Sequence, residues 1–470
     1  MGSTLPSKKT TRKAKSKRAR AVPNGVAGSG TSQVSQQARQ DWPTIECGAA
    51  GDHPSVQAFL TSLFHRPSSA EFQAQVDEPQ YEPSDRLLLK RGSRLVAHLR
   101  ISKREMRFGD LALPTAEIRD VATLPEFRRQ GCASALLQAA DQQMREDGAA
   151  LGVLNTSDPH FYAKRGWVVF GNQSYSEAGA RDVLSQLSAL RELRPTTFFT
   201  KVSQQPDTQL NIRLWRHVEE AALIRLYAEN TGHLFGPLER SPAYWRWLIS
   251  RRGYDRIYVA IKGPDKLPLD DKLTAIVGYA ATKGGRIAEL VTTPDHPEAA
   301  EHLLARACSE AIELDEYPVR FDAPPNHPLH QVFVDAGGQH HTGLIDQGEV
   351  QMAKLFDPMS FLNHLCPQIH GRAKASSLEL PTELGIQVDD QRYRIVFNQQ
   401  RITVVPGRLG RSYLTCGSGP FAQLLLGHLN VQEAIKAGKL AASTRIAVET
   451  ANSLFPKLQH WFPSLDNFTA

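Results

Sequence analysis

A loop of basic residues and glycine between a predicted strand and a predicted helix is the feature that most constrains this chain. The strand is expected at Ala116–Thr123 and the helix at Ala133–Glu146, and they are joined through Arg128-Arg129-Gln130-Gly131-Cys132-Ala133. Glycine and alanine at a helix start let the backbone approach a ligand closely, and the first helical amides have no intrahelical partner. The positive end of the helix dipole favours a bound phosphate. The pattern therefore predicts an α/β phosphate-binding unit.

The sequence around this loop predicts the rest of one mixed α/β domain. Two apolar runs, Arg86–Lys90 and Leu95–Ile101, are separated by a glycine-containing turn and indicate a hairpin. After the helix we expect a strand at Ala150–Leu154, a short helix at Asp158–Lys164 and a strand at Trp167–Phe170.

A second stretch, from about Leu210 to Leu355, repeats this order of strands and helices. The segment before its helix at Pro297–Glu313 reads TTPDHPEAAEHLL, which has neither glycine nor arginine at the matching positions. We interpret it as a repeat of the fold without a cofactor loop. From about Pro358 onward, alternating strands followed by helices predict an α+β domain.

Coenzyme A has the chemical groups that a loop of this kind can bind. Its pyrophosphate needs free helical amides, and its amide-bearing pantetheine arm needs free backbone groups such as those that end the strand before the loop. At this point the sequence resembles a family. The pattern Arg-x-x-Gly-x-Ala is similar to the acyl-coenzyme-A signature of the GNAT superfamily, and Phe161-Tyr162 with Gly166-Trp167 resembles a second segment of the same superfamily.

The order of the three parts resembles the enhanced intracellular survival (Eis) family of N-acetyltransferases. The resemblance implies tandem GNAT-like α/β domains, the second degenerate, followed by a sterol-carrier-protein-like α+β domain. The expected boundaries are a basic tail at 1–42, a catalytic domain at 43–200, a degenerate domain at 201–356 and the last domain at 357–470. Acetyl-coenzyme A would be the co-substrate, without a metal.

The resemblance also implies which residues contact the cofactor. The backbone at the end of the strand would bind the pantetheine arm, through Val121, Ala122 and Thr123. The loop would bind the pyrophosphate, through Arg128, Arg129, Gly131, Cys132 and Ala133. Ser157 would lie near the adenosine or the pantetheine arm. Tyr162 matches the superfamily's catalytic tyrosine and would protonate the departing thiolate.

Two carboxylates are candidates for the general base. Deprotonating an alkyl ammonium at pH 7 costs about 4–5 kcal/mol, so the site must supply an acceptor for that proton. In Eis-like proteins the carboxylate of a final Phe enters the active site, whereas this chain continues past Phe468 to Ala470. Ala470 could supply the carboxylate from a shifted position, or Glu117 on the strand before the loop could be the base; the alternatives stay open.

Charge and composition constrain the compartment and the partners. Residues 1–40 hold nine basic residues and no acidic one, so the net charge of +6 becomes −3 without them. The tail has no aromatic residue to stack on bases, which argues against nucleic acid as a partner. Five scattered cysteines without a C-x-x-C pair predict reduced thiols in the cytoplasm, and no apolar run suggests a membrane span.

The expected acceptor is a primary amine, on a small polyamine- or aminoglycoside-like molecule or on a lysine side chain. The Eis resemblance implies a homo-oligomer, possibly a hexamer. Two other functions compete: a non-catalytic acyl-coenzyme-A or lipid-binding protein, and a nucleic-acid-associated protein directed by its tail. The histidines at 327, 330, 340 and 341 fit no metal spacing. The cluster Tyr244-Trp245-Arg246-Trp247 is expected to pack between domains.

Overall fold

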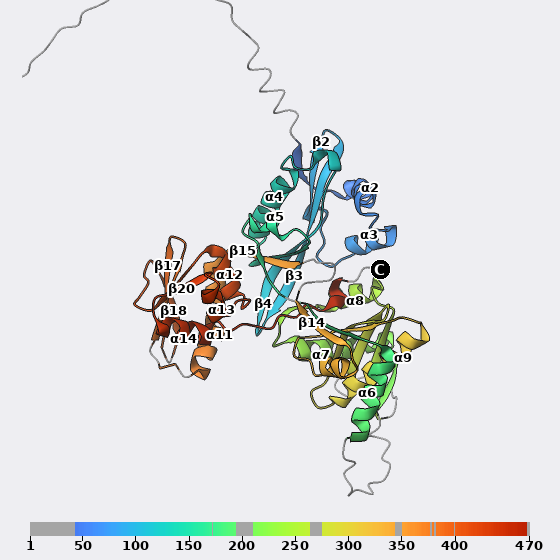
Figure 1. Ribbon diagram of the computed structural model, residues 1–470. Helices are drawn as coiled ribbons and strands as arrows, with labels where there is room; N and C mark the ends of the chain where they lie inside the picture. Colours follow the sequence, from blue (N-terminus) through green and yellow to red (C-terminus); the bar gives the residue numbers. More distant parts are fainter. Residues whose placement is uncertain are drawn as a thin grey trace, which may run out of the picture. The chain divides into compact units, whose positions relative to one another are not determined.

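The computed structural model describes residues 43–171, 173–193, 210–263, 275–343, 350–376, 378–379, 382–398 and 400–467 (Figure 1). Residues from Thr44 onward form one compact unit. The basic tail, Phe468 and Ala470 lie outside the described residues. Among the described helices, none is both long enough and apolar enough to cross a bilayer.

The first sheet contains the predicted strands of the first domain and two strands from much later in the chain. Its order is β1 (Thr44–Cys47), β2 (Arg86–Arg91), β3 (Arg94–Phe108), β4 (Leu111–Thr123), β5 (Leu151–Thr156), β15 (Val350–Leu355) and β6 (Val168–Val169). A further strand, β9 (Phe235–Leu238), pairs with the end of β3. The hairpin and the strands around the loop are thus where the sequence predicted them.

Helices cover both faces of this sheet (Figure 1). On one face α4 (Cys132–Glu146) and α5 (Pro159–Ala163) share a buried core with the sheet, in which Leu136, Leu137 and Trp167 are almost fully buried. On the other face α2 (His53–Phe64) and α3 (Ser69–Val76) cover Leu88 and Ala122. The apolar stripe predicted along the loop helix is the side that packs on the sheet.

The second sheet has seven strands, and one of them comes from before residue 200, where the sequence placed the boundary between the first two domains. The order is β14 (Gln339–Gly343), β7 (Gln173–Ala178), β13 (Val319–Asp322), β12 (Arg286–Thr292), β11 (Ile276–Lys283), β10 (Arg256–Lys262) and β8 (Leu210–Leu214). β7 and the helix after it, α6 (Ala180–Leu193), precede residue 200 but pack here. Similarly, β15 precedes residue 356 but belongs to the first sheet.

Alternating side chains of the second sheet build two cores. One face packs against α6, α9 (Glu298–Glu313) and α10 (Leu329–Asp335), and the other against α7 (Glu220–Thr231) and α8 (Pro242–Ser250). In α8, Trp247 Nε1 donates to the carbonyl oxygen of Ala74 in α3 at 2.7 Å. Tyr244 contacts Arg104 of β3, so two of the aromatic side chains pack against the first part as expected, whereas Trp245 is buried in the core of the second part.

The last part is the predicted α+β domain. Its sheet order is β18 (Ile402–Pro406), β17 (Gln391–Phe397), β16 (Thr382–Val388), β19 (Tyr413–Cys416) and β20 (Leu440–Ala442). The helices are α11 (Pro358–Ala375), α12 (Ser418–Leu425), α13 (Val431–Lys436) and α14 (Arg445–Leu454). The helix expected at Pro420–Leu429 ends earlier, before Gly427, which has a φ of +68°.

After α14 the chain runs back to the two α/β parts. Trp461 donates its amide to Phe235 at 2.9 Å, and a short 3-10 helix at Ser464–Asn467 lies beside β12. Ser464 Oγ donates to the carbonyl oxygen of Ala288 at 3.1 Å. The C-terminal segment is therefore part of the structure around the first two sheets rather than an extension of the last domain.

Candidate functional site

Among the described residues, no side chain caps the helix that follows the loop before α4. Gly131 is the residue before the helix, with a φ of +89°, and a Cβ at this position would meet nothing within 4 Å. The first helical amide with a described backbone partner is that of Ala135, which bonds to Gly131 at 3.0 Å. Arg128, Arg129 and Gly131 are exposed. This is the geometry of an anion site at a helix N-terminus.

Arg165 adds a cation to the first turn of α4. Its guanidinium lies 3.9 Å from the centre of the Phe161 ring and donates hydrogen bonds to the Phe161 carbonyl and to Ser134 Oγ. Ser134 is in the first turn of α4, so the positive charge is held close to the free amides. The sequence motif contains this arginine between Tyr162 and Gly166, but only the fold brings it to the loop.

Strands β4 and β5 pair in parallel only from Thr115–Leu151 to Glu117–Val153. Beyond that point β4 continues through Val121, Ala122 and Thr123 with β3 on its other side, and β5 continues beside β15. The two strands therefore present unpaired edges to each other. This opening leads from the loop and is where an amide-bearing arm could bond to the backbone of β4.

A β-bulge shapes the end of β4. The register shifts between the pairs His98–Ala122 and Arg100–Arg119, and Asp120 has a φ of +53°. His98 Nδ1 donates to the Asp120 carbonyl oxygen at 2.9 Å, and Arg86 Nη1 donates to His98 Nε2 at 3.3 Å. A carbonyl only accepts and a guanidinium only donates, so both bonds require the neutral imidazole. Burial and the charge of Arg86 lower the pKa of His98 to about 4.

Replacing His98 by Phe is expected to destabilise the protein and to change its response to acid. The Asp120 carbonyl and Arg86 would lose a buried partner, at a cost of about 1–3 kcal/mol. In the wild type the unfolded chain binds a proton below its ordinary histidine pKa of 6.5 whereas folded His98 does not, so this residue makes stability fall between about pH 6.5 and pH 4. His98→Phe should lose that part of the pH dependence.

Urea unfolding followed at pH 7 and pH 5 measures this. His364→Phe is the control, because His364 is exposed on α11. If His98→Phe and the wild type lost equal stability between the two pH values, His98 would not be the buried neutral group described.

Tyr162 lies in α5 on the same face of the sheet as α4. It is largely buried, packs edge-on against Phe161 at 5.0 Å between ring centres, and its hydroxyl has no hydrogen-bond partner among the described residues. Burial and the nearby charge of Asp158 raise the pKa of Tyr162 above its usual value. The residue is therefore a protonated phenol at neutral pH, as a general acid must be.

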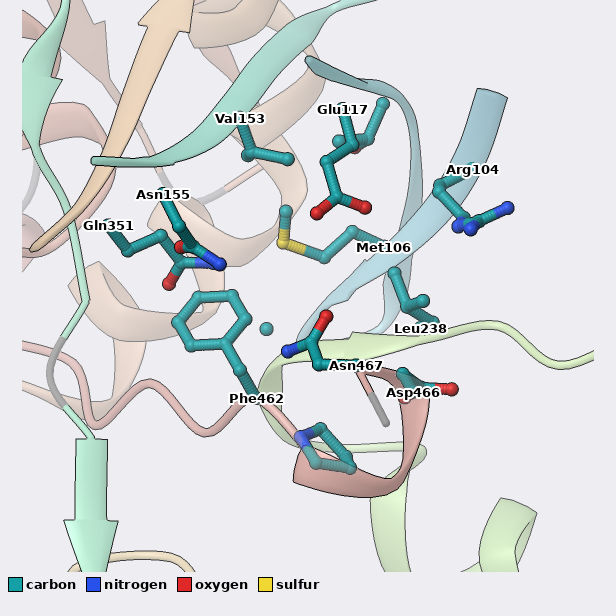
Figure 2. A pocket seen from close by; sticks show the side chains of 13 residues that line it. Arg104, Met106, Glu117, Val153, Asn155, Leu238, Gln351, Phe462, Asp466 and Asn467 are labelled. Carbon is teal, nitrogen blue, oxygen red and sulfur yellow. The ribbon is translucent and has the colours of Figure 1, made fainter. Parts of the chain in front are cut away.

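On the opposite face of the sheet, residues from five strands and the C-terminal segment line a cleft whose open space, with the solvent at its mouth, is about 460 Å³ (Figure 2). β3 contributes Arg104 and Met106, and β4 and β5 contribute side chains that alternate with the α4-facing core. The full lining is Arg104, Met106, Thr115, Glu117, Val153, Asn155, Gly236, Leu238, Gln351, Phe462, Pro463, Asp466 and Asn467. The cleft is thus placed where β4 and β5 begin to separate.

Glu117 is in this cleft, whereas Tyr162 is not among its lining residues. Glu117 Oε2 lies 2.8 Å from Arg119 Nε, and Arg119 Nη2 donates to Asn467 Oδ1 at 2.9 Å. The sequence did not single out Asn155, Gln351, Phe462 or Asn467. Gln351 lies in the cleft because β15 pairs with β5, and Phe462 because the neighbouring Trp461 bonds to the backbone of Phe235. Both contacts join residues about 200 positions apart, so no local sequence pattern marks them.

The C-terminal segment is held at the cleft by buried ion pairs. Arg240 is fully buried; it pairs through Nη2 with Glu289 Oε2 at 2.6 Å and through Nε with Asp466 Oδ1 at 3.0 Å. Tyr244 donates its hydroxyl to Asp466 at 3.2 Å. Burial by itself would lower the pKa of Arg240, but Asp466 and Glu289 raise it well above its usual value. Arg251 also donates to the carbonyl oxygen of Leu465 at 2.6 Å.

Two further residues of the predicted cofactor-binding set, Cys132 and Ser157, differ in their exposure to solvent. Cys132 is buried, and burial raises the pKa of its thiol, which suits a packing residue better than a nucleophile. Ser157 and Asp158 are exposed, and Asp158 caps α5 through the amide of Phe161 at 3.2 Å. The described residues contain no group of three or more side chains placed to hold a metal ion.

Two parts of the chain match known protein families. Residues 46–170 match the acetyltransferase (GNAT) domain, and residues 375–463 match the sterol carrier protein domain. These matches confirm the two domains that the sequence resemblance implied. A comparison with curated protein sequences finds no match.

Solved structures share the fold over nearly the whole chain. A GCN5-related N-acetyltransferase from Kribbella flavida is 17% identical with a TM-score of 0.65, and covers 90% of this chain and 98% of its own. One from Anabaena variabilis is 17% identical with a TM-score of 0.64, and covers 89% and 99%. Eis1 from Mycobacterium abscessus is 15% identical with a TM-score of 0.58, and covers 89% and 98%. The predicted fold class is confirmed.

Proposed function

We propose that this chain, which carries an acetyltransferase (GNAT) domain and a sterol carrier protein domain, transfers the acetyl group of acetyl-coenzyme A to a primary amine. The observation that carries the proposal is the loop at Arg128–Ala133, which is exposed through Gly131, leads into a helix without a side-chain cap and lies beside an opening between two strands. The GNAT domain belongs to a superfamily that uses acetyl-coenzyme A. Acceptors suggested by the Eis resemblance are polyamines, aminoglycosides and lysine side chains.

The loop has the chemistry that the cofactor requires. The first amides of α4, together with Arg128, Arg129 and Arg165, would hold the pyrophosphate, and the free edge of β4 at Val121–Thr123 would hold the pantetheine arm. The space beside Gly131 leaves room for the phosphates. The bound thioester supplies an electrophilic carbonyl. The amine in the cleft on the other face would reach it through the opening between β4 and β5.

In the reaction the amine nitrogen bonds to the acetyl carbon, and the carbon–sulfur bond breaks. The amine loses one proton to a base, and the thiolate takes one from an acid, so the products are an amide and free coenzyme A. Tyr162 is the proposed acid, since it is protonated at neutral pH and follows β5. Glu117 and the carboxylate of Ala470 remain alternative bases. Ala470 is three residues after Asn467, at most about 11 Å of extended chain.

Tyr162→Phe tests the acid. Packing against Phe161 would be preserved because only the hydroxyl is lost, so the melting temperature should stay within a few degrees of the wild type. We expect kcat to fall about 100-fold, the scale of general-acid catalysis, with an unchanged dissociation constant for acetyl-coenzyme A. Because burial raises the pKa of Tyr162, wild-type kcat should decline only above the usual phenol range, as the hydroxyl loses its proton.

The measurement is the release of coenzyme A thiol across pH 6–10.5 with a panel of amines. A variant with wild-type kcat at every pH would exclude Tyr162 as the acid. The base must be deprotonated to act, so its protonation should lower kcat at the acidic end of the pH profile. This decrease should disappear either in Glu117→Gln or in a chain that lacks residues 468–470, and the variant in which it disappears identifies the base. Binding of acetyl-coenzyme A by the wild type without thiol release to any amine would instead favour a non-catalytic acyl-coenzyme-A or lipid-binding protein.

A further inference from the structure

Among the described residues, each charged side chain of the cleft has an ion-pair partner. Arg104 pairs with Glu78, Glu117 pairs with Arg119, and Asp466 pairs with the buried Arg240. Each of these partners comes from outside the lining itself. A cleft that selects polycations would instead present carboxylates without partners, because each buried charge of the ligand needs one of the opposite sign.

Two carboxamides in the cleft, by contrast, have hydrogen-bonding capacity to offer. Asn155 on β5 and Gln351 on β15 are directly paired across the two strands, so their side chains are neighbours on the same face. Figure 2 shows both side chains beside Phe462 at the same end of the cleft. Within the described part of the chain, neither carboxamide donates or accepts a side-chain hydrogen bond. Together they offer neutral donors and acceptors to a ligand.

Apolar side chains provide the remaining surface. Met106, Val153, Leu238 and Phe462 come from β3, β5, β9 and the C-terminal segment and lie around the same opening. Because the cleft is open to solvent on one side, an acceptor can lie against these walls with part of its body outside. The described lining therefore combines apolar walls, two neutral carboxamides and charged side chains that already have ion-pair partners.

We infer that the acceptor carries one positive charge, on the reacting amine, and that the rest of it is neutral, with hydrogen-bonding groups and apolar surface. This inference rests on the proposed acetyl transfer and narrows its substrate class, away from polyamines and aminoglycosides. Asn155 and Gln351 bind the neutral polar group, the apolar walls contact the body, and the amine enters the gap between β4 and β5.

A matched pair of probes tests the charge. N-acetyl-1,5-diaminopentane and 1,5-diaminopentane have the same carbon chain between nitrogens, but the first has a neutral amide where the second has an ammonium. We expect kcat/KM from thiol release to be at least tenfold higher for the acetylated probe. For the acetylated probe, kcat/KM should also change less than twofold between 50 and 300 mM NaCl. Salt weakens attraction between unpaired charges, and the charged side chains of the cleft already have partners. Kanamycin, a polycation, should react more slowly than either.

Variants of the two carboxamides test the binding role. Gln351→Leu keeps the size of the side chain and removes its hydrogen bonds, so KM for the acetylated probe should rise about fivefold or more, with kcat nearly unchanged. Gln351→Glu adds an unpaired carboxylate and should shift the preference toward 1,5-diaminopentane. Gln138→Leu on the exposed side of α4 is the control and should change neither.

The outcomes separate this inference from the function on which it rests. A preference for 1,5-diaminopentane or kanamycin, with kcat/KM falling steeply as salt rises, overturns the charge argument while supporting acetyl transfer. Equal KM values in the wild type and Gln351→Leu overturn the role of the carboxamides. Thiol release with none of the amines overturns the proposed function, and this inference with it.

Discussion

We expect acetyl-coenzyme A to raise the melting temperature of the wild type and to leave that of Gly131→Glu unchanged. The new side chain has room, because a Cβ at this position meets nothing within 4 Å, so the fold should persist. Its carboxylate would lie beside the uncapped amides of α4 and occupy the site that a pyrophosphate needs. Losing these bonds and adding like-charge repulsion should weaken binding at least 100-fold.

Gly148→Glu is a close control for this substitution. Gly148 also has a positive φ, +79°, and open space around its Cβ, but it follows the C-terminal end of α4. Both variants therefore carry the same backbone strain, about 1 kcal/mol, and the same added charge. Isothermal titration with acetyl-coenzyme A should show binding to Gly148→Glu and none to Gly131→Glu. Equal affinities would mean that the loop does not hold the pyrophosphate.

Arg240→Met is expected to have the largest effect on stability. The guanidinium is fully buried between Glu289 and Asp466, so its removal leaves two buried carboxylates without their cation. Breaking a buried pair in this way costs about 3–5 kcal/mol. The segment Ser464–Asn467 would lose its main attachment to the second sheet, and Asn467 would leave the cleft. We therefore expect kcat to fall at least tenfold.

The same substitution should leave acetyl-coenzyme A binding intact, because the loop before α4 lies on the opposite face of the first sheet. Arg213→Met is the matched control: Arg213 pairs with Glu219 at the edge of the second sheet and is partly exposed. It should cost less stability and leave kcat unchanged. Measurements at a temperature where both variants are folded separate the two effects. Wild-type kcat in folded Arg240→Met would show that the segment's position does not matter for catalysis.

The loop before α4 could be predicted from the sequence because its determinants are local. A strand, a glycine that tolerates a positive φ, and an amphipathic helix follow one another within about 30 residues, and each has its own signal. The same locality explains why α4 and β5 begin within two residues of their expected positions. Tyr162 was recognised through a motif, and its place beside α4 agrees with that motif.

The cleft on the opposite face of the sheet could not be predicted in this way. Gln351 reaches it only because β15 pairs with β5, and Phe462 and Asn467 only because the C-terminal segment returns to β9 and β12. β7 and β15 each join a sheet on the far side of an expected domain boundary, and strand pairing between such distant segments leaves no periodic trace in either segment.

The sequence by itself therefore determined where a helix preceded by a positive-φ glycine forms, because backbone conformation and helix dipole depend on adjacent residues. Only the tertiary structure decided what lies on the opposite face of the sheet. Arg240 and Glu289 form one buried charge cluster with Asp466, which follows both of them by more than 150 residues in the sequence. The charge balance and free carboxamides of the cleft are properties of that packing, since a side chain's partner is set by distance in space and not along the chain.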